Sequence, residues 1–377
     1  MRVVFTCGGT AGHINPALAV AKLIKARRPS SEILFIGAEG GMETDLVPRE
    51  GFPIETVRIA SFSRSFKPSA IKHNISMLFM RRESVRRSRK MLLEFNPDIV
   101  VGTGGFASYP AVTAAAALGI PTAIHESNMK PGLTTSILSR NAKKIMVGFP
   151  SADKFYKHPE RVVVTGTPVR EDFLFKSRAA AKRELGLDSA PLVLSYWGSL
   201  GAREMNKMIA RFIKLEVSEA ARFNHIHSTG SFGWKWMPDL LRKKGINLEG
   251  TRVDMREYVY NMPTVMSAAD IVICRGGAST LSEVLASATP AIIVPSPNVA
   301  ENHQEANARA LEKEGGAVVI LESETTGERL YSEVSVLLED KERLEKMSDS
   351  LRKMAILDSA ERIYEVIKAL VDKGITG

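Results

Sequence analysis

Short apolar runs alternate with longer segments of helical periodicity along almost the whole chain. Seven runs in the first half predict strands, near residues 2–6, 32–36, 54–58, 98–102, 121–125, 143–148 and 161–165. Six runs in the second half predict strands near residues 191–196, 223–228, 251–254, 270–274, 289–294 and 317–320. Strands that alternate with helices form parallel sheets covered on both faces. The pattern therefore predicts the α/β class, with two Rossmann-like, doubly wound parallel-sheet domains.

A strand, a glycine turn and a helix start follow one another near the beginning of each half. The first turn is Gly9–Gly12 (GTAG) and the second is Gly198–Gly201 (GSLG). A helix that begins directly after such a turn leaves backbone N–H groups free at its N-terminus, where the helix dipole favours an anion. The two copies predict two facing phosphate sites, one in each half.

A second pair of similar segments lies further along each half. Val101–Ser108 resembles Ile273–Ser279, and each segment follows an apolar strand. Open α/β sheets bind ligands at the carboxyl ends of their strands, where these glycines are placed. That position favours a binding function over the alternative, the duplication of a stable domain with no retained chemistry.

The domain organisation follows from a break near the middle of the chain. Gly166–Arg170 (GTPVR) ends a strand in glycine and proline, which predicts a linker and two domains, residues 1–169 and 170–357. A last helix is expected over residues 358–377, because Asp358 and Glu361 resemble a capping box. Its single apolar stripe predicts that this helix packs back on the first domain.

The composition is that of a globular protein with about two domains. The chain has 377 residues, of which 44% are hydrophobic and 25% charged. Its two cysteines, Cys7 and Cys274, give no disulfide framework, which fits a reducing compartment. Neither a signal-peptide layout nor a membrane-spanning apolar stretch is recognisable, so the cytoplasm or the inner face of the cell membrane is expected.

The net charge of +9 favours acidic partners, and much of it is concentrated in residues 81–90. An apolar helical face precedes this basic cluster, an arrangement typical of helices that bind peripherally to anionic membranes. The expected membrane contacts are Ile71, Ile75, Leu78, Phe79, Arg81, Arg82, Arg86 and Arg87. Two alternatives stay open: the apolar face packs on the sheet, or the basic run is a solvated helix face. Nucleic acid is disfavoured, because no aromatic residues interleave with the cations and no nucleic-acid motif is present.

His13 distinguishes the first glycine turn from the second, where Ala202 takes its place. A histidine at the mouth of a phosphate-binding turn can act as a general base near neutral pH, and the alternative is a structural histidine that caps the turn. Glu126 ends a strand on the same edge of the predicted sheet. Its carboxylate is suited either to orient His13 or to accept local hydrogen bonds.

In the second half, candidate ligand-binding residues are most concentrated in Arg275–Glu283 (RGGASTLSE). Its glycines allow a phosphate to approach the backbone, and Ser279 and Thr280 add hydroxyl donors at the helix start. Glu283 is placed to accept two sugar hydroxyls, or alternatively serves only as an acid near a helix N-terminus. No CxxC, HExxH, GxSxG or GxxxxGK[ST] motif occurs, so neither a metal nor a cofactor is expected.

Several motifs together resemble a known enzyme family over nearly the whole chain. They are GGTAGHINPALAVA (8–21), GTGGFASYP (102–110), IPTAIHESN (120–128), VTGTPVR (164–170), GSLGA (198–202), CRGGASTLSE (274–283) and ENHQEANARALEKEG (301–315). The chain is similar to the bacterial peptidoglycan glycosyltransferases that add N-acetylglucosamine to a lipid-linked muramyl-pentapeptide precursor. The resemblance implies a two-domain glycosyltransferase fold of the GT-B type with a central cleft, and UDP-N-acetylglucosamine as the donor.

The resemblance also implies roles for individual residues. Donor contacts are expected at Thr10, Ala11, Gly12, Asn128, Arg170, Ser199, Val259, Ala278, Ser279, Thr280, Leu281, Ser282, Glu283 and Gln304. The acceptor pyrophosphate is expected at Gly102, Thr103, Gly104 and Gly105. His13, oriented by Glu126, would take the proton from the 4-hydroxyl of the acceptor sugar in one inverting displacement. The expected partners are the donor, undecaprenyl-pyrophosphoryl-muramyl-pentapeptide, an anionic membrane surface, and cell-wall or division proteins.

Some positions depart from the family's usual pattern. Ala11, Ser127, Trp197 and Leu200 stand where glycine, glutamine, glycine and glutamine are common. The missing amide at Leu200 puts one polar contact to the donor in doubt. Two other functions remain as alternatives: a different UDP-sugar enzyme of the same fold, either another lipid glycosyltransferase or a UDP-N-acetylglucosamine 2-epimerase, and an inactive homologue that recruits partners at the membrane.

Overall fold

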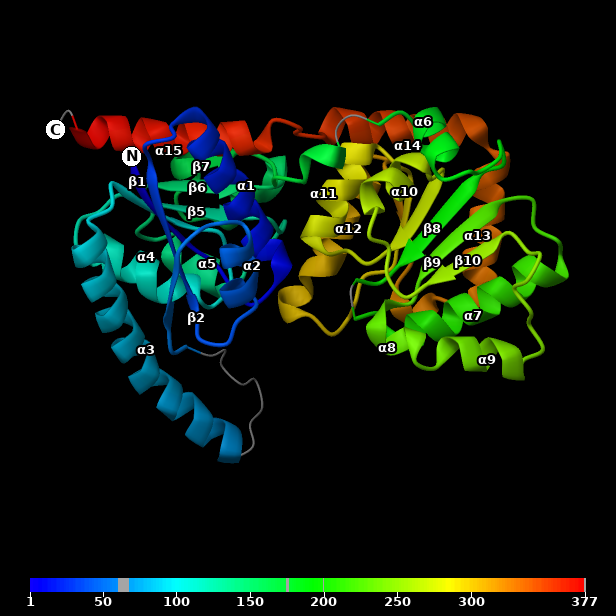
Figure 1. The fold of residues 1–377 in the computed structure, drawn as a ribbon, viewed down its shortest axis with the longest axis horizontal. Coiled ribbons are helices and arrows are strands. Elements are labelled where there is room, and N and C mark those ends of the chain that lie inside the picture. The colour runs from blue at the N-terminus through cyan, green and yellow to red at the C-terminus, as the bar shows by residue number, and fades with distance from the viewer. Residues whose placement is uncertain (60–67, 174–175, 199, 376–377) are drawn as a thin grey trace. The chain divides into compact units, whose positions relative to one another are not determined.

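The computed structural model describes residues 1–59, 68–173, 176–198 and 200–375. The side chains of residues 68–79, 171, 300 and 373–375 are also left out of the description. Internal contacts divide the chain into two compact units. Unit 1 is Met1–Val169 with Ile356–Gly377, and unit 2 is Arg170–Ala355. Figure 1 shows the ribbon of both units, and each is considered by itself below.

Unit 1 is built on a seven-stranded parallel sheet of order β3-β2-β1-β4-β5-β6-β7. The strands are β1 (Arg2–Thr6), β2 (Glu32–Ala38), β3 (Ile54–Val57), β4 (Ile99–Gly102), β5 (Thr122–Glu126), β6 (Lys144–Val147) and β7 (Val162–Val164). Its helices are α1 (Ala11–Arg27), α2 (Glu43–Arg49), α3 (Pro68–Phe95), α4 (Ser108–Ala117), α5 (Leu133–Leu138) and α15 (Ser359–Ile375). The central strands are buried on both faces, which explains their uninterrupted apolar sequences.

Unit 2 repeats this plan with a six-stranded parallel sheet of order β10-β9-β8-β11-β12-β13. The strands are β8 (Leu192–Tyr196), β9 (Asn224–Ser228), β10 (Val253–Arg256), β11 (Ile271–Cys274), β12 (Ala291–Ile293) and β13 (Ala317–Val319). Its helices are α6 (Arg178–Glu184), α7 (Arg203–Ser218), α8 (Gly230–Trp234), α9 (Met237–Lys243), α10 (Met262–Ala268), α11 (Ala278–Ser287), α12 (His303–Lys313), α13 (Gly327–Glu339) and α14 (Lys341–Met354). All thirteen strands expected from the sequence are present, so the predicted α/β class with two doubly wound sheets is confirmed.

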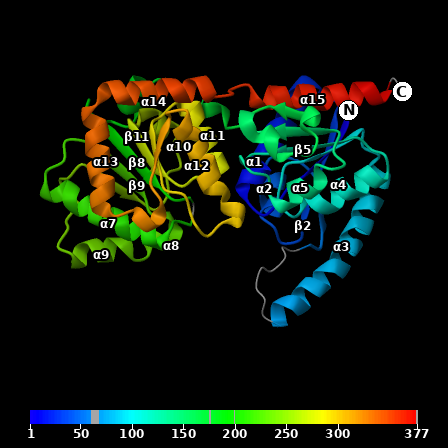
Figure 2. The same cartoon turned by 180° about the vertical axis from the view of Figure 1, so that it is seen from behind.

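The C-terminal helix α15 belongs to the core of unit 1. Ile363, Tyr364, Ile367 and Val371 on its apolar stripe are buried together with residues of β1 and α1. Figures 1 and 2 show α15, in red, running beside α1. The first and last segments of the chain therefore share one hydrophobic core.

Helix α3 carries the basic cluster and packs against α4 at the outer side of unit 1, as Figures 1 and 2 show. Its buried face includes Ser84, Ser88, Met91 and Leu92. The side chains of Ile71, Ile75, Leu78 and Phe79 lie outside the described residues. Within the described part of the chain, no helix is both long enough and apolar enough to cross a bilayer.

In each sheet the strand order reverses at one point, between β1 and β4 in unit 1 and between β8 and β11 in unit 2. Strands on the two sides of such a point are followed by helices on opposite faces, which leaves a crevice at the carboxyl edge of the sheet. All four glycine segments singled out in the sequence directly follow these four strands. The fold thus brings the glycine turns together in pairs, one pair in each unit.

Candidate functional site

The first glycine turn leaves the N-terminus of α1 open. Thr10 precedes the helix in an extended conformation, and its side chain makes no capping hydrogen bond. The backbone N–H groups of His13 and Ile14 donate to the carbonyl of Thr10, at 3.1 and 3.3 Å. The N–H groups of Ala11 and Gly12 precede these bonds, at partly exposed positions where a helix dipole attracts an anion.

His13 is fixed in one tautomer by its surroundings. Its Nδ1 lies 3.0 Å from the carbonyl oxygen of Gly8 and 3.4 Å from the hydroxyl of Thr10. Because a carbonyl only accepts, Nδ1 carries the hydrogen, and in a neutral imidazole Nε2 is then the unprotonated nitrogen. Among the described residues Nε2 has no hydrogen-bond partner. The partly buried ring therefore presents a basic nitrogen that is free to accept a proton.

The glycine segment after β4 packs directly on this imidazole. A Cβ atom added to Gly105 would lie 2.0 Å from the carbonyl oxygen of Gly8, and one added to Gly104 would meet the His13 ring. The hydroxyl of Thr103 donates to the carbonyl of His13 at 2.7 Å. The structure therefore brings the predicted base and the predicted acceptor-pyrophosphate segment into contact.

Glu43 is a buried residue beneath this turn that the sequence analysis missed. Its side chain is fully buried, and its carboxylate accepts from the backbone N–H of Ala38 at 2.8 Å and of Gly9 at 3.4 Å. A Cβ atom at Gly8 or Gly41 would lie within 2.5 Å of its carboxylate oxygens. The only sequence signal was an acid placed just after a group of glycines, which does not by itself indicate where the carboxylate points.

Glu126 makes the local hydrogen bonds that the sequence analysis gave as one of its two possible roles. Its carboxylate accepts from the backbone N–H of Asn128 at 3.0 Å, from the Asn128 side-chain amide at 2.9 Å and from the N–H of Gly132 at 3.1 Å. These local bonds shape the loop after β5. His125, the neighbouring residue, donates from Nε2 to the carbonyl of Gly166 at 2.9 Å, and burial lowers its pKa.

In unit 2 the corresponding turn is anchored on β9. A Cβ atom at Gly201 would lie 2.1 Å from the carbonyl oxygen of Thr229, which also accepts from the Asn206 amide at 2.8 Å. Ser199 lies outside the described residues. Leu200 is 58% exposed, whereas Trp197 is buried. The unusual leucine therefore faces solvent and the unusual tryptophan belongs to the core.

Helix α11 begins at the carboxyl end of β11, directly across the reversal point from this turn. Gly277 is its extended N-cap residue, and Ala278, Ser279 and Thr280 form a partly exposed first turn. Leu281 is fully buried, and the Ser282 hydroxyl donates to the carbonyl of Ala278 at 2.9 Å. The first turn therefore offers N–H groups and two hydroxyls to a ligand, while the Leu281 side chain packs inward.

Glu283 lies in the second turn of α11 and is partly exposed. Burial raises its pKa to about 7, opposed by the charge of Arg170 and reinforced by that of Asp172. Arg170 is itself held by a bidentate pair with Asp172, at 2.6 and 3.2 Å. Behind Glu283 lies the hydroxyl of Tyr196, which is buried without a well-formed hydrogen bond although Thr280 is close to it. A carboxylate so placed changes its charge near neutral pH.

The remaining predicted donor residues lie on the same edge of this sheet. Gln304, in the first turn of α12, accepts from the backbone N–H of Ser296 at 2.8 Å, which leaves its amide NH2 group for another partner. Asn307 on the same helix donates to the carbonyl of Gly276 at 3.0 Å and is fully buried. Val259 is buried in the loop after β10. In the described part of the chain, no group of three or more His, Cys, Asp or Glu could hold a metal ion.

Two domain models of one known family match the two halves of the chain. The model of the glycosyltransferase family 28 N-terminal domain matches residues 3–147, and that of the family's C-terminal domain matches residues 193–363. The two matched segments coincide with the main parts of unit 1 and unit 2.

Two relatives and two solved structures illustrate the similarity. UDP-N-acetylglucosamine–N-acetylmuramyl-(pentapeptide) pyrophosphoryl-undecaprenol N-acetylglucosamine transferase of Acetivibrio thermocellus is 40% identical over 378 residues, covering 100% of both chains. The transferase of the same name from Ruminiclostridium cellulolyticum is 40% identical and covers 98% of this chain and 100% of its own.

The crystal structure of Acinetobacter baumannii MurG superposes with a TM-score of 0.77 at 26% identity, covering 98% of this chain and 99% of that one. A UDP-N-acetylglucosamine 2-epimerase from Neisseria meningitidis has a TM-score of 0.65 at 15% identity, covers 98% of this chain and 100% of its own, and shares the fold alone. With both domain models matched and close relatives over its full length, the chain belongs to glycosyltransferase family 28.

Proposed function

We propose that this protein transfers N-acetylglucosamine from UDP-N-acetylglucosamine to the 4-hydroxyl of a lipid-linked N-acetylmuramyl-pentapeptide, in peptidoglycan synthesis. The observation that carries the proposal is the free Nε2 of His13, set between the open N-terminus of α1 and the Gly104–Gly105 turn. The full-length relatives named as transferases of this kind support the choice of donor and acceptor.

The acceptor pyrophosphate is assigned to Gly102–Gly105, the glycine segment of unit 1 at the end of β4. At the reversal point of the sheet, the backbone N–H groups of Gly104 and Gly105 make none of the described hydrogen bonds, whereas the N–H of Thr103 donates to the carbonyl of Thr6 at 3.0 Å. Gly104 and Gly105 carry no side chain that would hold an anion away from the backbone. Anion binding of this kind orients the acceptor sugar relative to His13.

The donor is assigned to unit 2. The first turn of α11 is suited to the diphosphate, since its N–H groups and the hydroxyls of Ser279 and Thr280 are partly exposed. Glu283 then accepts from the ribose hydroxyls, and the free amide NH2 of Gln304 donates to a sugar hydroxyl. Thr10, Ala11, Gly12, Asn128, Arg170, Ser199 and Val259 remain further proposed donor contacts.

The reaction is a single displacement that inverts the anomeric carbon. The acceptor 4-hydroxyl oxygen forms a bond to that carbon while the bond to the UDP oxygen breaks, and the hydroxyl proton passes to His13 Nε2. UDP leaves with the bonding electron pair, and the helix N-terminus stabilises the charge that develops on it. Glu126 shapes the loop after β5, and its part in orienting His13 stays a prediction.

Peripheral binding at the cytoplasmic face of the cell membrane is proposed for α3. Arg82, Arg86 and Arg89 are exposed and lie on one side of the helix by their spacing, while Arg81 stacks on the Tyr109 ring and Arg87 pairs with Glu39 at 3.0 Å. Arg82, Arg86 and Arg89, which form no ion pair among the described residues, are therefore the arginines of this cluster most available to anionic lipid headgroups. Of the four arginines expected at the membrane, the proposal keeps Arg82 and Arg86, sets aside Arg81 and Arg87, and adds Arg89.

Incubation with UDP-N-acetylglucosamine, with and without the lipid-linked muramyl-pentapeptide, tests the proposal. We expect UDP to be released only when the acceptor is present, together with a β-1,4-linked disaccharide product. Conversion of the sugar nucleotide without acceptor would instead identify a UDP-N-acetylglucosamine epimerase. Binding of the donor without any conversion would identify an inactive homologue.

A further inference from the structure

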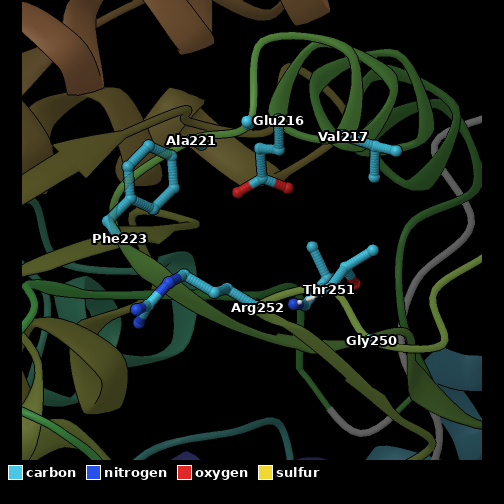
Figure 3. Close-up of a pocket in the computed structure, with 9 residues that line it drawn as sticks. Glu216, Val217, Ala221, Phe223, Gly250, Thr251 and Arg252 are labelled. Carbon is cyan, nitrogen blue, oxygen red and sulfur yellow. Dashed lines mark hydrogen bonds between the residues drawn. The ribbon is translucent and has the colours of Figure 1, made fainter.

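A cavity of about 310 Å³ opens at the edge of unit 2 opposite the glycine turns. It lies between the C-terminal end of α7 and the amino ends of β9 and β10, whereas the proposed donor site is at their carboxyl ends. Its lining, drawn in Figure 3, consists of Glu216, Val217, Ala220, Ala221, Phe223, Gly250, Thr251, Arg252 and Val253. The volume is at the lower end of the range for small-molecule sites.

The carboxylate of Glu216 is the most distinctive group in this lining. It is 4% exposed, and Figure 3 shows it directed into the space between α7 and the strands. One of its oxygens lies 2.9 Å from Nδ1 of His225, which is fully buried. Whether that imidazole is charged decides whether the carboxylate already has a counter-ion.

The hydrogen bonds behind His225 settle its protonation. The Ser195 hydroxyl lies 2.7 Å from His225 Nε2 and 2.7 Å from His227 Nδ1, and that same Nδ1 lies 3.2 Å from the carbonyl oxygen of Ser195. A carbonyl cannot donate, so His227 Nδ1 carries a hydrogen and the hydroxyl accepts from it. The hydroxyl hydrogen has no other acceptor among the described residues, so the arrangement that satisfies every donor directs it to His225 Nε2, which is then unprotonated. His225 is therefore neutral and donates from Nδ1 to Glu216.

His227 adds no positive charge to this network either. Burial holds the pKa of His227 well below its ordinary value. The network from Glu216 to His227 is thus a chain of neutral groups behind one buried carboxylate. A buried carboxylate without a cationic partner is costly, which makes this position receptive to a cation.

The cation that lines the cavity, Arg252, is already engaged. Its guanidinium donates to Asp188 at 2.8 Å and to the side-chain oxygen of Asn224 at 3.1 Å. Figure 3 shows its guanidinium end lying away from Glu216. Among the charged residues that line this cavity, Glu216 is therefore the one that faces it without a charge partner.

The other walls of the cavity also favour a ligand that combines a positive charge with an apolar stem. Phe223 forms one wall and is tilted against Tyr331, with ring centroids 6.4 Å apart. The C-terminal end of α7 forms another wall, and the negative end of a helix dipole attracts cations. Aromatic faces attract organic ammonium groups in the same way. Val217 and Ala221 supply aliphatic contact.

We propose that this cavity binds a small organic cation, a primary alkylammonium with a short apolar stem. Its ammonium group pairs with the free oxygen of Glu216, and its stem lies against Phe223 and Val217. The site is separate from the proposed donor and acceptor contacts and does not depend on the proposed function.

Titration with n-butylammonium, followed by NMR shifts of the protein's amides, tests this directly. We expect saturable binding with the largest shifts around Val217 and Thr251, and no saturable binding of n-butanol, which has the same stem without the charge. Glu216→Gln keeps the shape and removes the charge, and should weaken n-butylammonium binding at least about tenfold, or 1.4 kcal/mol. Glu249→Gln removes one exposed carboxylate next to the cavity, and should leave the affinity within about twofold.

A second variant keeps the test decisive if Glu216→Gln loses its structure. Val217→Phe fills the cavity and leaves Glu216 and its hydrogen bonds in place, so it should abolish binding while the amide spectrum stays that of a folded protein. Equal binding of butanol and butylammonium, or unchanged binding in Val217→Phe, would overturn the proposal. So would an absence of saturable binding in the wild-type protein.

Discussion

A Cβ atom on Gly104 would lie only 2.6 Å from Cδ2 of the His13 imidazole. Real Cβ atoms do not approach so closely, so the ring and the backbone after β4 occupy positions that exclude any larger residue. Gly104 also has a φ of +111°, in a region that L side chains rarely adopt. The position of the proposed base is therefore set by a segment about ninety residues away in the sequence.

Substitution of Gly104 with alanine should displace His13. We expect turnover to fall at least about tenfold, since displacements of about 1 Å can cost about 100-fold, while UDP-N-acetylglucosamine affinity stays unchanged. Gly119→Ala is the matched control, because Gly119 has a φ of +76° with nothing within 4 Å of an added Cβ atom. It shares the backbone strain and leaves His13 alone. Steady-state kinetics with both substrates decide, and equal losses in the two variants would contradict the assigned contact.

His13→Ala should remove the proton acceptor without disturbing the donor. General-base losses are typically about 100-fold or more, so we expect turnover to drop by at least that factor while calorimetry shows unchanged UDP binding. Asn15→Ala, an exposed position on the same helix, is the control for helix perturbation. Wild-type turnover in His13→Ala would take the base role away from this residue.

Glu43→Gln should destabilise unit 1 although the two side chains have nearly the same shape. The carboxylate accepts N–H donors from both Ala38 and Gly9, and an amide turns its NH2 group toward one of them. A buried donor left without an acceptor costs about 1–3 kcal/mol of unfolding free energy. Asp45→Asn, an exposed acid on the same helix, should cost less than about 0.5 kcal/mol. Urea denaturation of both variants gives the comparison, and equal effects would mean that Glu43 does not support the turn.

Glu283 should make donor binding depend on pH. Its pKa of about 7 means that the carboxylate ionises between pH 6 and 8, and an ionised carboxylate is the better acceptor for ribose hydroxyls. We expect the affinity for UDP-N-acetylglucosamine to rise across this interval and to become flat in Glu283→Gln. The donor is a diphosphate diester that does not titrate in this range. Glu339→Gln, an exposed acid on α13, should keep the wild-type profile.

The stability of the unliganded protein should follow the opposite trend. Folding raises the pKa of Glu283 from its ordinary value of 4.5 to about 7, so its contribution is fully present below about pH 4.5 and is lost as pH rises through about 7. As pH rises over this interval, the unfolding free energy of the wild-type protein should therefore fall relative to that of Glu283→Gln. A constant difference would show that the carboxyl group titrates normally.

Charge reversal on α3 should weaken membrane binding. Replacement of Arg82, Arg86 and Arg89 with glutamate removes three exposed arginines that form no ion pair among the described residues, each worth about 1 kcal/mol near an anionic surface. We expect sedimentation with phosphatidylglycerol vesicles to fall strongly and turnover on a soluble acceptor analogue to persist. The control reverses an equal number of exposed charges in unit 2, at Arg242, Lys243 and Lys244. If both triple variants bind vesicles equally, α3 has no special part in membrane binding.

The sheets were predictable because doubly covered parallel strands require uninterrupted apolar runs, as in Ile99–Val101 and Ile271–Ile273. The glycine turns were predictable for a similar reason, since each one links a strand to a helix in sequence. The support given by Glu43 was not predictable, because it depends on glycines from separate elements meeting around one side chain.

The hydrogen-bond and ion-pair partners of other polar side chains could not be predicted, because they depend on which groups the fold brings close. The sequence left two roles open for the Glu126 carboxylate. In the structure, all of its described hydrogen bonds come from donors in the loop after β5. Likewise, the basic run does not distinguish Arg81 and Arg87 from Arg86. In the structure, Arg81 stacks on Tyr109 and Arg87 pairs with Glu39. By contrast, the alternation His225-x-His227 in a strand already put both imidazoles on one face of the sheet.

The placement of α15 in the core of unit 1 has a consequence for synthesis on the ribosome. Residues Ile363 and Ile367 close a hydrophobic core whose members outside α15 emerge more than two hundred residues earlier. Unit 2 is complete in the nascent chain before those residues are translated. The apolar surface of the N-terminal half therefore stays uncovered until α15 has been translated, and this late closure is where chaperone dependence and sensitivity to removal of α15 should concentrate.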